Sequence, residues 1–346
     1  MTTRTRYFVI LSLLVTIVGF GSGLVAYYVG FPAGAFSGAR GPEELQYVPR
    51  DAAVVAYVDV REVMASEVRQ HIRRALPSQE NGQQEFQNLT GINIETDIDH
   101  IVAYMEASSL TENHTSGLVL ARGTFAESKI EALMREHGGH VEQYRGKRLI
   151  IASSETHPRT DQTAPDTSPI SPKASDFALT FLKPGLAAVG NTHLVRSAVD
   201  LDNGGESLIA NEDVMSHIRS LESGNAWAVG RFDTLRSAAK LPEGVNQLPA
   251  ITWFSVAGRV ADSVTGVIRA ETRDDASANN LRDVVRGVMA LAKLQAGSQP
   301  KLEPFIQSLE LGGTGKTVAL SFTVPAQIFE LLAPGGARKG ESQRAH

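Results

Sequence analysis

Residues 54–60 read Val-Val-Ala-Tyr-Val-Asp-Val, and this short stretch decides the fold. A run of β-branched and aromatic residues of this length predicts a strand. A helix is predicted to follow, with an apolar face formed by Val60, Met64, Val68, Ile72 and Leu76. Residues 226–232, Ala-Trp-Ala-Val-Gly-Arg-Phe, repeat the strand pattern much later in the chain. The chain therefore contains two similar strand beginnings.

Other segments of the two halves align in the same order. Residues 101–106 match 251–256, residues 117–122 match 265–270, and the predicted hairpin strands 146–153 match 315–322. A helix is expected in each half. One follows a Thr-x-x-Glu capping box at Thr124, and the other carries an apolar stripe formed by Leu281, Val284, Val285, Val288, Leu291 and Ala292.

The order strand, helix, strand, strand, helix, hairpin does not alternate strictly between strands and helices. Short turns between neighbouring strands favour antiparallel pairing. We therefore predict an α+β fold built from a duplicated unit, in which helices pack on one face of an antiparallel sheet.

The N-terminus predicts a membrane anchor. Residues 7–31 carry no charge and follow Arg4 and Arg6, a length and charge pattern typical of one membrane-spanning helix with its N-terminus in the cytoplasm. A cleaved signal peptide is the alternative, with a cleavage site at residues 33–35. The length of the apolar run favours the anchor, and with it a location in the bacterial inner membrane with the remaining chain outside the cytoplasm.

Two glycines in this segment, Gly19 and Gly23, form a GxxxG pair. Small residues at this spacing allow two membrane helices to approach closely, which would support a homodimer. Glycine is also common in membrane helices that do not pair, so both interpretations stay open.

The predicted organisation divides the chain into six parts. They are a cytoplasmic N-terminus (1–6), a transmembrane helix (7–31), a stalk (32–46), a first α+β repeat (47–207), a second α+β repeat (208–335) and a flexible tail (336–346). Within the first repeat, residues 154–175 are rich in Pro, Ser, Thr and Asp and lack apolar periodicity, so we expect a disordered loop there.

Composition excludes several classes of function. The 346 residues are 42% hydrophobic and 21% charged, as in a folded protein. The net charge of −5 argues against a nucleic-acid partner, which requires a basic surface. The chain has no cysteine, which excludes disulfides, thiolate metal sites and cysteine nucleophiles.

Three motifs that suggest ligand sites are better explained as turns or helix ends. Residues 312–317 resemble part of a phosphate-binding loop, but Glu310 stands where that motif needs glycine, and a hairpin turn fits better. Residues 200–205 resemble the start of a calcium loop, but the last carboxylate of that motif is missing. His137 and His140 flank two glycines that are typical of a helix end.

We therefore name no catalytic residue, no cofactor and no metal ligand. Arg69, Arg73 and Arg74 cluster with His71 on the first predicted helix, which is typical of a solvated face, and contact with anionic lipid or polymer is the weaker alternative.

Residues 185–199, 207–214 and 226–229, together with residues 48–52 before the first strand, resemble a group of membrane-anchored bacterial envelope proteins built from domains of unknown function. The resemblance implies a bacterial source and an anchored extracytoplasmic domain. It transfers no catalytic residue.

Together these patterns favour a single-pass membrane protein whose extracytoplasmic domain is a non-enzymatic binding or scaffold module for an envelope protein. Edges of antiparallel sheets are natural docking sites for an extended partner segment. Two alternatives stay open: an anchored envelope hydrolase, and a module that binds lipid or a small ligand.

Overall fold

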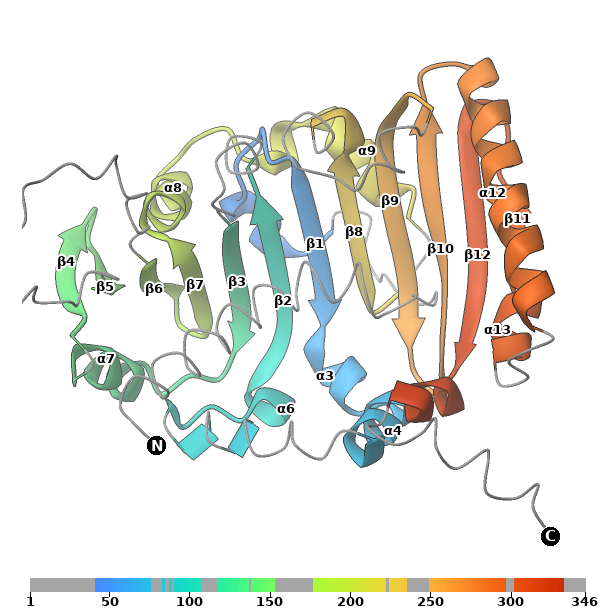
Figure 1. Ribbon diagram of the computed structural model, residues 1–346. Coiled ribbons are helices and arrows are strands. Elements are labelled where there is room, and N and C mark those ends of the chain that lie inside the picture. Colours follow the sequence, from blue (N-terminus) through green and yellow to red (C-terminus); the bar gives the residue numbers. More distant parts are fainter. Residues whose placement is uncertain are drawn as a thin grey trace, which may run out of the picture.

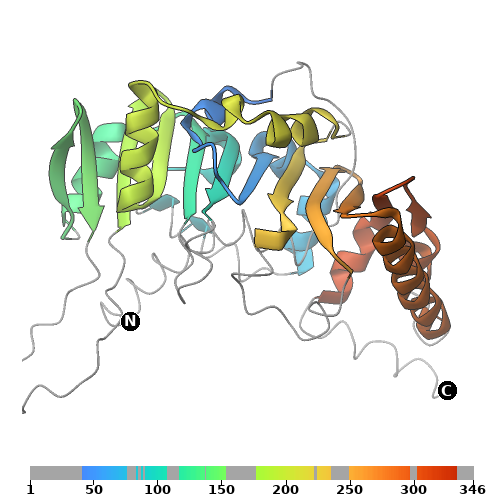
Figure 2. The same cartoon turned by 90° about the horizontal axis from the view of Figure 1, so that it is seen from above.

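The computed structural model describes residues 41–75, 83–84, 87–88, 90–106, 117–136, 138–152, 177–221, 224–234, 249–296 and 302–332. These residues form a mixed α+β fold around one antiparallel sheet of 12 strands, in the order β11-β12-β10-β9-β8-β1-β2-β3-β7-β6-β5-β4 (Figure 1). The prediction of an α+β fold with an antiparallel sheet is confirmed. Figure 2 views this sheet from above, with β4 and β5 at one end and α12 at the other.

The strands fall into two groups along the chain. The first half contains β1 (Val54–Asp59), β2 (Ile98–Met105), β3 (Gly117–Gly123), β4 (His140–Tyr144), β5 (Lys147–Ala152), β6 (Phe177–Lys183) and β7 (Leu186–Asn191). The second half contains β8 (Ala226–Arg231), β9 (Ile251–Val260), β10 (Ser263–Thr272), β11 (Glu310–Gly312) and β12 (Thr317–Pro325).

Helices connect and cover these strands. Those up to β8 are η2 (Glu43–Tyr47), α3 (Val60–Met64), α4 (Glu67–Ala75), α6 (Ile94–Asp97), α7 (Glu127–Glu136), α8 (Thr192–Asp202), η4 (Leu208–Ala210) and α9 (Glu212–Arg219). Those after it are α12 (Asp275–Ala296), α13 (Glu303–Gln307) and η6 (Ala326–Leu332).

The two halves meet at the centre of the sheet through β1 and β8. Ala56 pairs with Ala228 at the middle of this ladder. Beyond the ladder, the N–H of Asp59 donates to the carbonyl of Asn225 (2.7 Å), and the N–H of Arg231 donates to that of Ala53 (2.9 Å). Outward from this centre, β2 and β3 follow on one side as β9 and β10 follow on the other. The hydrogen bonding is thus symmetric about the central pair.

The ladders correct our alignment of the next strands. Val54 pairs with Met105 and its counterpart Ala226 pairs with Gly258, so Met105 corresponds to Gly258 rather than to Ser255. By the same reasoning Gly117 corresponds to Gly266, one residue beyond the predicted Thr265. An odd shift exchanges the two faces of a strand. The sequence did not reveal the error because both faces of these strands carry apolar residues.

The outer strands of the two halves differ. In the second half β12 pairs directly with β10, whereas in the first half the β6–β7 hairpin lies between β3 and β5. The hairpins β4–β5 and β11–β12 are therefore the outermost strands of the two halves, but β4–β5 lies two strands farther from β3 than β11–β12 lies from β10.

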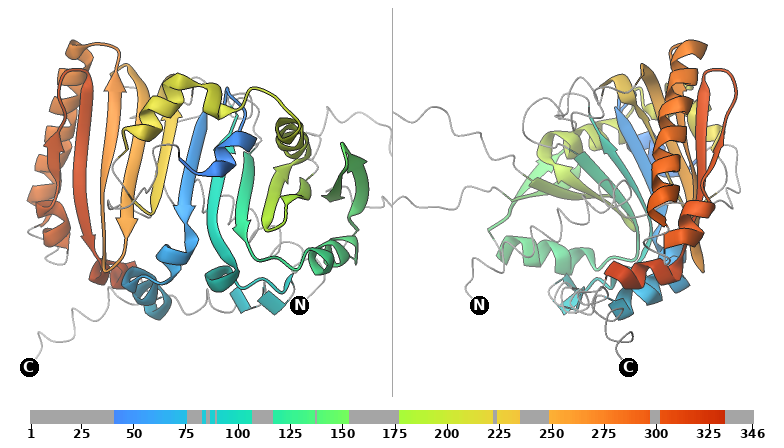
Figure 3. Two further views of the ribbon diagram at one scale, coloured as in Figure 1. Left: turned by 180° about the vertical axis from the view of Figure 1, so that it is seen from behind. Right: turned by 45° about the vertical axis from the view of Figure 1, so that its right-hand side comes forward.

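Helices cover both faces of the sheet, so the prediction of helices on one face is wrong. One face, here called the η2 face, carries η2, α8 and α9 (Figure 3, left). There Leu194 of α8 packs in one buried cluster with Leu118 and Trp227 of the sheet. On the opposite α7 face, α3, α6, α7, α12 and α13 pack over residues such as Val119 and Ile150. Successive strand residues point to opposite faces, so a run such as residues 54–58 of β1, in which every residue is apolar, needs cover on both sides.

The helix predicted after β1 is divided in two. The hydroxyl of Ser66 accepts a hydrogen bond from the N–H of Arg69 (3.1 Å) and donates one to the carbonyl of Val63 (2.6 Å), which ends α3 and caps α4. As a result Val60 and Met64 pack beneath β2, while Val68 and Ile72 pack against η6 and the ends of β9 and β10.

Among the residues that the structure describes, no helix is long and apolar enough to cross a membrane. The predicted span at residues 7–31, the pair Gly19 and Gly23, the predicted loop at 154–175 and the predicted tail at 336–346 lie outside the described residues.

Candidate interaction surfaces

The most exposed apolar surface of the described chain lies along α12. We call the stripe Val284, Val288, Leu291 and Leu294 the α12 surface. These side chains are 44%, 61%, 62% and 79% exposed. They recur at the spacing that places residues on one side of a helix. Beside them, at Gly287, an added Cβ would meet nothing within 4 Å.

The way α12 packs on the sheet explains why this stripe stays uncovered. Ala278, Leu281 and Val285 pack against the sheet, where they contact a cluster that includes Ile251 and Val318. The apolar arc of α12 is therefore wider than the part that the sheet covers. Figure 3 shows α12 in the foreground, at the outer end of the second half. Exposed apolar patches of this kind mark interaction sites more often than single exposed side chains do.

Ile268 on β10 is another exposed apolar side chain, on the α7 face of the sheet. It is 42% exposed. Its counterpart in the first half, by the corrected register, is Val119 on β3, which is 4% exposed and belongs to a cluster against which Ile92 and Ile94 pack. The described residues thus cover this position in the first half and leave it open in the second.

A buried ionic cluster lies on the η2 face of the first half. The Glu44 carboxylate of η2 is 2% exposed and lies 3.1 Å from His100 Nε2 on β2 and 2.7 Å from Arg122 Nη2 on β3. Burial alone would raise the pKa of Glu44, but hydrogen bonding and charge from His100, with a hydrogen bond from Arg122, hold that pKa at about 2. The cluster fastens η2 to the sheet.

Tyr57 extends this cluster toward the centre of the sheet. Its ring lies 5.5 Å from the ring of His100 and is stacked on Trp227 at 5.8 Å, measured between centroids. Burial raises the pKa of the Tyr57 hydroxyl to about 12. The phenol therefore stays neutral at physiological pH, and the aromatic row packs as part of the core.

The two aspartates at the end of α8 have partners other than a metal. Asp200 accepts a hydrogen bond from the hydroxyl of Tyr144 (3.0 Å) and pairs with Arg145 (2.6 Å). Asp202 pairs with Lys147 (3.3 Å) and accepts a hydrogen bond from Tyr47 (3.2 Å). The helix ends at Asp202, as the helix-end interpretation predicts. Among the described residues, no group of three or more acidic or histidine side chains is arranged to hold a metal ion.

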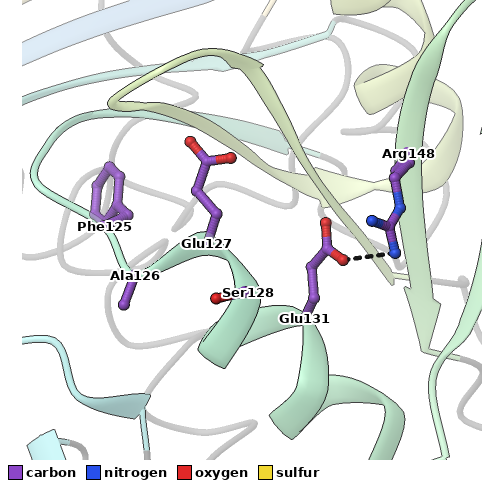
Figure 4. Close-up of a pocket in the computed structure, with 6 residues that line it drawn as sticks. All are labelled: Phe125, Ala126, Glu127, Ser128, Glu131 and Arg148. Atoms are coloured by element: carbon purple, nitrogen blue, oxygen red, sulfur yellow. Dashed lines mark ion pairs between the residues drawn. The ribbon is translucent and has the colours of Figure 1, made fainter.

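A shallow hollow lies beside α7. It is lined by Phe125, Ala126, Glu127, Ser128, Glu131 and Arg148 (Figure 4). Glu131 pairs with Arg148 of β5 at 2.8 Å and with Arg135 at 3.2 Å, so its carboxylate is already neutralised. These contacts hold α7 against β5.

The remaining sequence motifs also have structural partners. Residues 313–316 form the turn between β11 and β12, as predicted. Arg69 and Arg73 of α4 both approach Glu95, at 3.2 and 4.0 Å. His140 lies on β4, and His137 lies outside the described residues. One sequence pattern does coincide with an exposed surface, namely the apolar stripe on α12. The sequence alone indicates only that this helix packs on the sheet.

Side chains add to the backbone hydrogen bonding of β12, which lies next to the edge strand β11. At the second-half end, the hydroxyl of Ser308 donates to the carbonyl of Thr323 (2.9 Å) and accepts from its N–H (2.8 Å). Arg282 donates to the carbonyl of Thr317 (2.9 Å). Between them, β11 pairs with residues 319–321 of β12. At the first-half end, β4 is the last strand.

Comparison with known proteins gives little. No protein family matches the chain, and no curated protein matches its sequence. Two crystal forms of TP0453, forms I and III, are similar in structure, with TM-scores of 0.44 and 0.45 and 9% identity. In both, the similarity covers 85% of this chain and 98% of TP0453.

Proposed function

We propose that this chain is an extracytoplasmic binding or scaffold module of the bacterial envelope, anchored in the inner membrane by residues 7–31 and docked to a partner protein through the α12 surface. The observation that supports the partner is the α12 surface itself, where four large apolar side chains in a row are exposed on one helix.

The membrane anchor and the stalk of this proposal are inferred from the sequence. The uncharged span and the short stalk at 32–46 would hold the folded residues near the membrane. The symmetric hydrogen bonding around β1 and β8 supports an origin of the two halves by duplication. In this interpretation the first half serves mainly to complete the core, and the second half presents α12.

The anchored hydrolase and the module for lipid or a small ligand remain weaker alternatives. No contact among the described residues favours either of them. Two largely buried carboxylates that a hydrolase could use already have basic partners. Glu44 pairs with His100 and Arg122, and Glu131 pairs with Arg135 and Arg148.

Photo-crosslinking in native membranes tests the proposal. A photoreactive phenylalanine analogue placed at Val288 should give an adduct with a different protein. The same residue at Arg286, which is exposed on the same helix but outside the apolar stripe, is the matched control and should give much less.

Three results would contradict the proposal. The first is a crosslink that stays within one chain, because the chain itself would then cover the stripe. The second is an adduct of twice the chain mass, which would assign the surface to self-association. The third is equal adducts from positions 286 and 288.

A further inference from the structure

We infer that the partner protein presents an amphipathic helix to the α12 surface, and that a large apolar side chain of that helix inserts at Gly287. The inference rests on the proposed function, because it names the element that the partner brings to the same surface. It is supported by a glycine that the described fold does not require, by the arrangement of the residues around it, and by the charges beside them.

Gly287 lies in the interior of α12 and is exposed to solvent. Glycine inside a helix is less favourable than alanine, so its presence there needs a reason. An added Cβ would meet nothing within 4 Å, and the φ angle of Gly287 is not positive. Within the described part of the chain, neither packing nor backbone conformation therefore requires glycine at this position. Close approach of a group from outside the chain does require it.

The residues around Gly287 form the outline of a packing site for a helix. Val284, Gly287, Val288 and Leu291 stand at positions i, i+3, i+4 and i+7 on one side of α12. Four residues at this spacing form the hole that receives one side chain of a facing helix in knobs-into-holes packing. Gly287 leaves this hole open at one corner, and the other three corners are apolar and exposed. A large apolar side chain matches both its size and its chemistry.

The backbone of α12 favours a helical partner over an extended one. In the interior of an α-helix, the N–H and C=O groups bond to each other along the helix. An extended segment laid on α12 would therefore gain no backbone hydrogen bond from it. The segment would also press its own unpaired backbone groups against apolar side chains, which is unfavourable. A partner helix satisfies its backbone internally and avoids this cost.

The charges beside the α12 surface favour a protein helix over an anionic lipid surface. Asp283 and Arg286, next to the apolar stripe, are both mostly exposed and pair with each other at 2.8 Å. Arg282 donates to the carbonyls of Gly315 and Thr317. Helices that bind anionic membranes carry an excess of Lys and Arg on their polar face. A balanced pair of charges instead matches a partner helix that carries both signs on its flank.

Photo-crosslinking in native membranes, with the adducts sequenced by mass spectrometry, tests the shape of the partner. A photoreactive phenylalanine analogue is placed singly at Val284 and at Leu291, which are about 10 Å apart along α12. With a helical partner, the two adducts should map to residues of one partner segment that are about seven positions apart. An extended partner covers the same distance in about three residues, and that spacing would overturn the inference.

Filling the hole tests the insertion at Gly287. With the analogue at Leu294, Gly287→Leu should lower the adduct yield by about tenfold or more. Gly287→Ala should lower it less, while the purified full-length variant should melt at a higher temperature, because alanine favours the helix. Binding that weakens while the fold becomes more stable is not the result of unfolding. Ala290→Leu is the matched control, because Ala290 is exposed on α12 outside the hole, and it should keep the yield.

An unchanged yield in Gly287→Leu would overturn the inference, because no side chain would then occupy the hole. An equal loss in Ala290→Leu would also overturn it, because added bulk anywhere on α12 would then have the same effect. Both results would leave the docking of a different protein at the α12 surface intact. If the chain with Gly287 forms no adduct with a different protein from any of these positions, the proposed function itself fails.

Discussion

Each half of the sheet begins with three neighbouring strands, β1 to β3 in the first and β8 to β10 in the second, and the halves differ in the elements that follow. The first half adds the β6–β7 hairpin and α8, which enlarge the core on the η2 face. The second half adds the long α12 and leaves apolar side chains in solvent. Among the described residues, every exposed large apolar side chain except Ile209 lies after β8 in the chain. The same arrangement of three strands can therefore gain either a larger buried core or an exposed apolar surface. Which of the two it gains depends on the elements that follow the third strand.

The largest expected effect is a matched pair of leucine truncations. Leu194 on α8 is completely buried, while Leu291 on α12 is 62% exposed. Leu194→Ala should lower the free energy of unfolding by about 2–5 kcal/mol because it leaves a cavity. Leu291→Ala should change it by less than about 0.5 kcal/mol. Urea denaturation of both variants measures the difference, and similar losses would mean that Leu291 is buried in the native protein.

A smaller effect is expected from acid titration of the first half. The pKa of Glu44 is about 2 in the folded protein, against an ordinary value of 4.5. Because the folded pKa is lowered, the stabilisation is complete above pH 4.5 and is lost as the pH falls toward 2. It amounts to roughly 3 kcal/mol.

Urea denaturation between about pH 5 and pH 2 measures this loss. In Glu44→Gln the unfolding free energy should fall less steeply over that range. Glu310→Gln, on the exposed strand β11 of the second half, is the matched control and should keep the wild-type slope. An unchanged slope in Glu44→Gln would show that folding does not lower the pKa of Glu44.

The smallest effect concerns the hydrogen bonds between Ser308 and β12 in the second half. Ser308→Ala removes the hydroxyl that bonds both backbone groups of Thr323, and should cost about 1 kcal/mol. Amide exchange at Thr323 should become faster, whereas Ser308→Thr keeps a hydroxyl and should preserve most of the protection. Unchanged exchange in the alanine variant would mean that the Ser308 hydroxyl does not hold the backbone of Thr323.

The sequence predicted the strands better than their register. Apolar runs located β1 and β8, and the Asn and Gly residues after α8 indicated that a helix ends close to Asp202. The counterpart of Met105 was misplaced because strands that are apolar on both faces give no alternating pattern to count. The division between α3 and α4 depended on the hydroxyl of Ser66, which the apolar spacing from Val60 to Ile72 did not indicate.

The α12 surface could be predicted only in part. The spacing from Leu281 to Leu291 showed a broad apolar stripe, but the width that the sheet covers is set by residues distant in the chain, such as Ile251 and Val318. The exposed surface arises from tertiary arrangement, whereas the helix that carries it arises from local sequence.

The ladder between β1 and β8 also has a consequence for how the chain folds. Val54 pairs with Gly230, so this contact closes a very long loop. By contrast, the paired strands β2 and β3 follow each other directly in the sequence, as do β9 and β10. Loop-closure entropy makes long-range pairing the slow part of β-sheet folding. Each half can thus assemble its local strands on its own, and the joining of β1 to β8 becomes the step that sets the rate for the whole sheet.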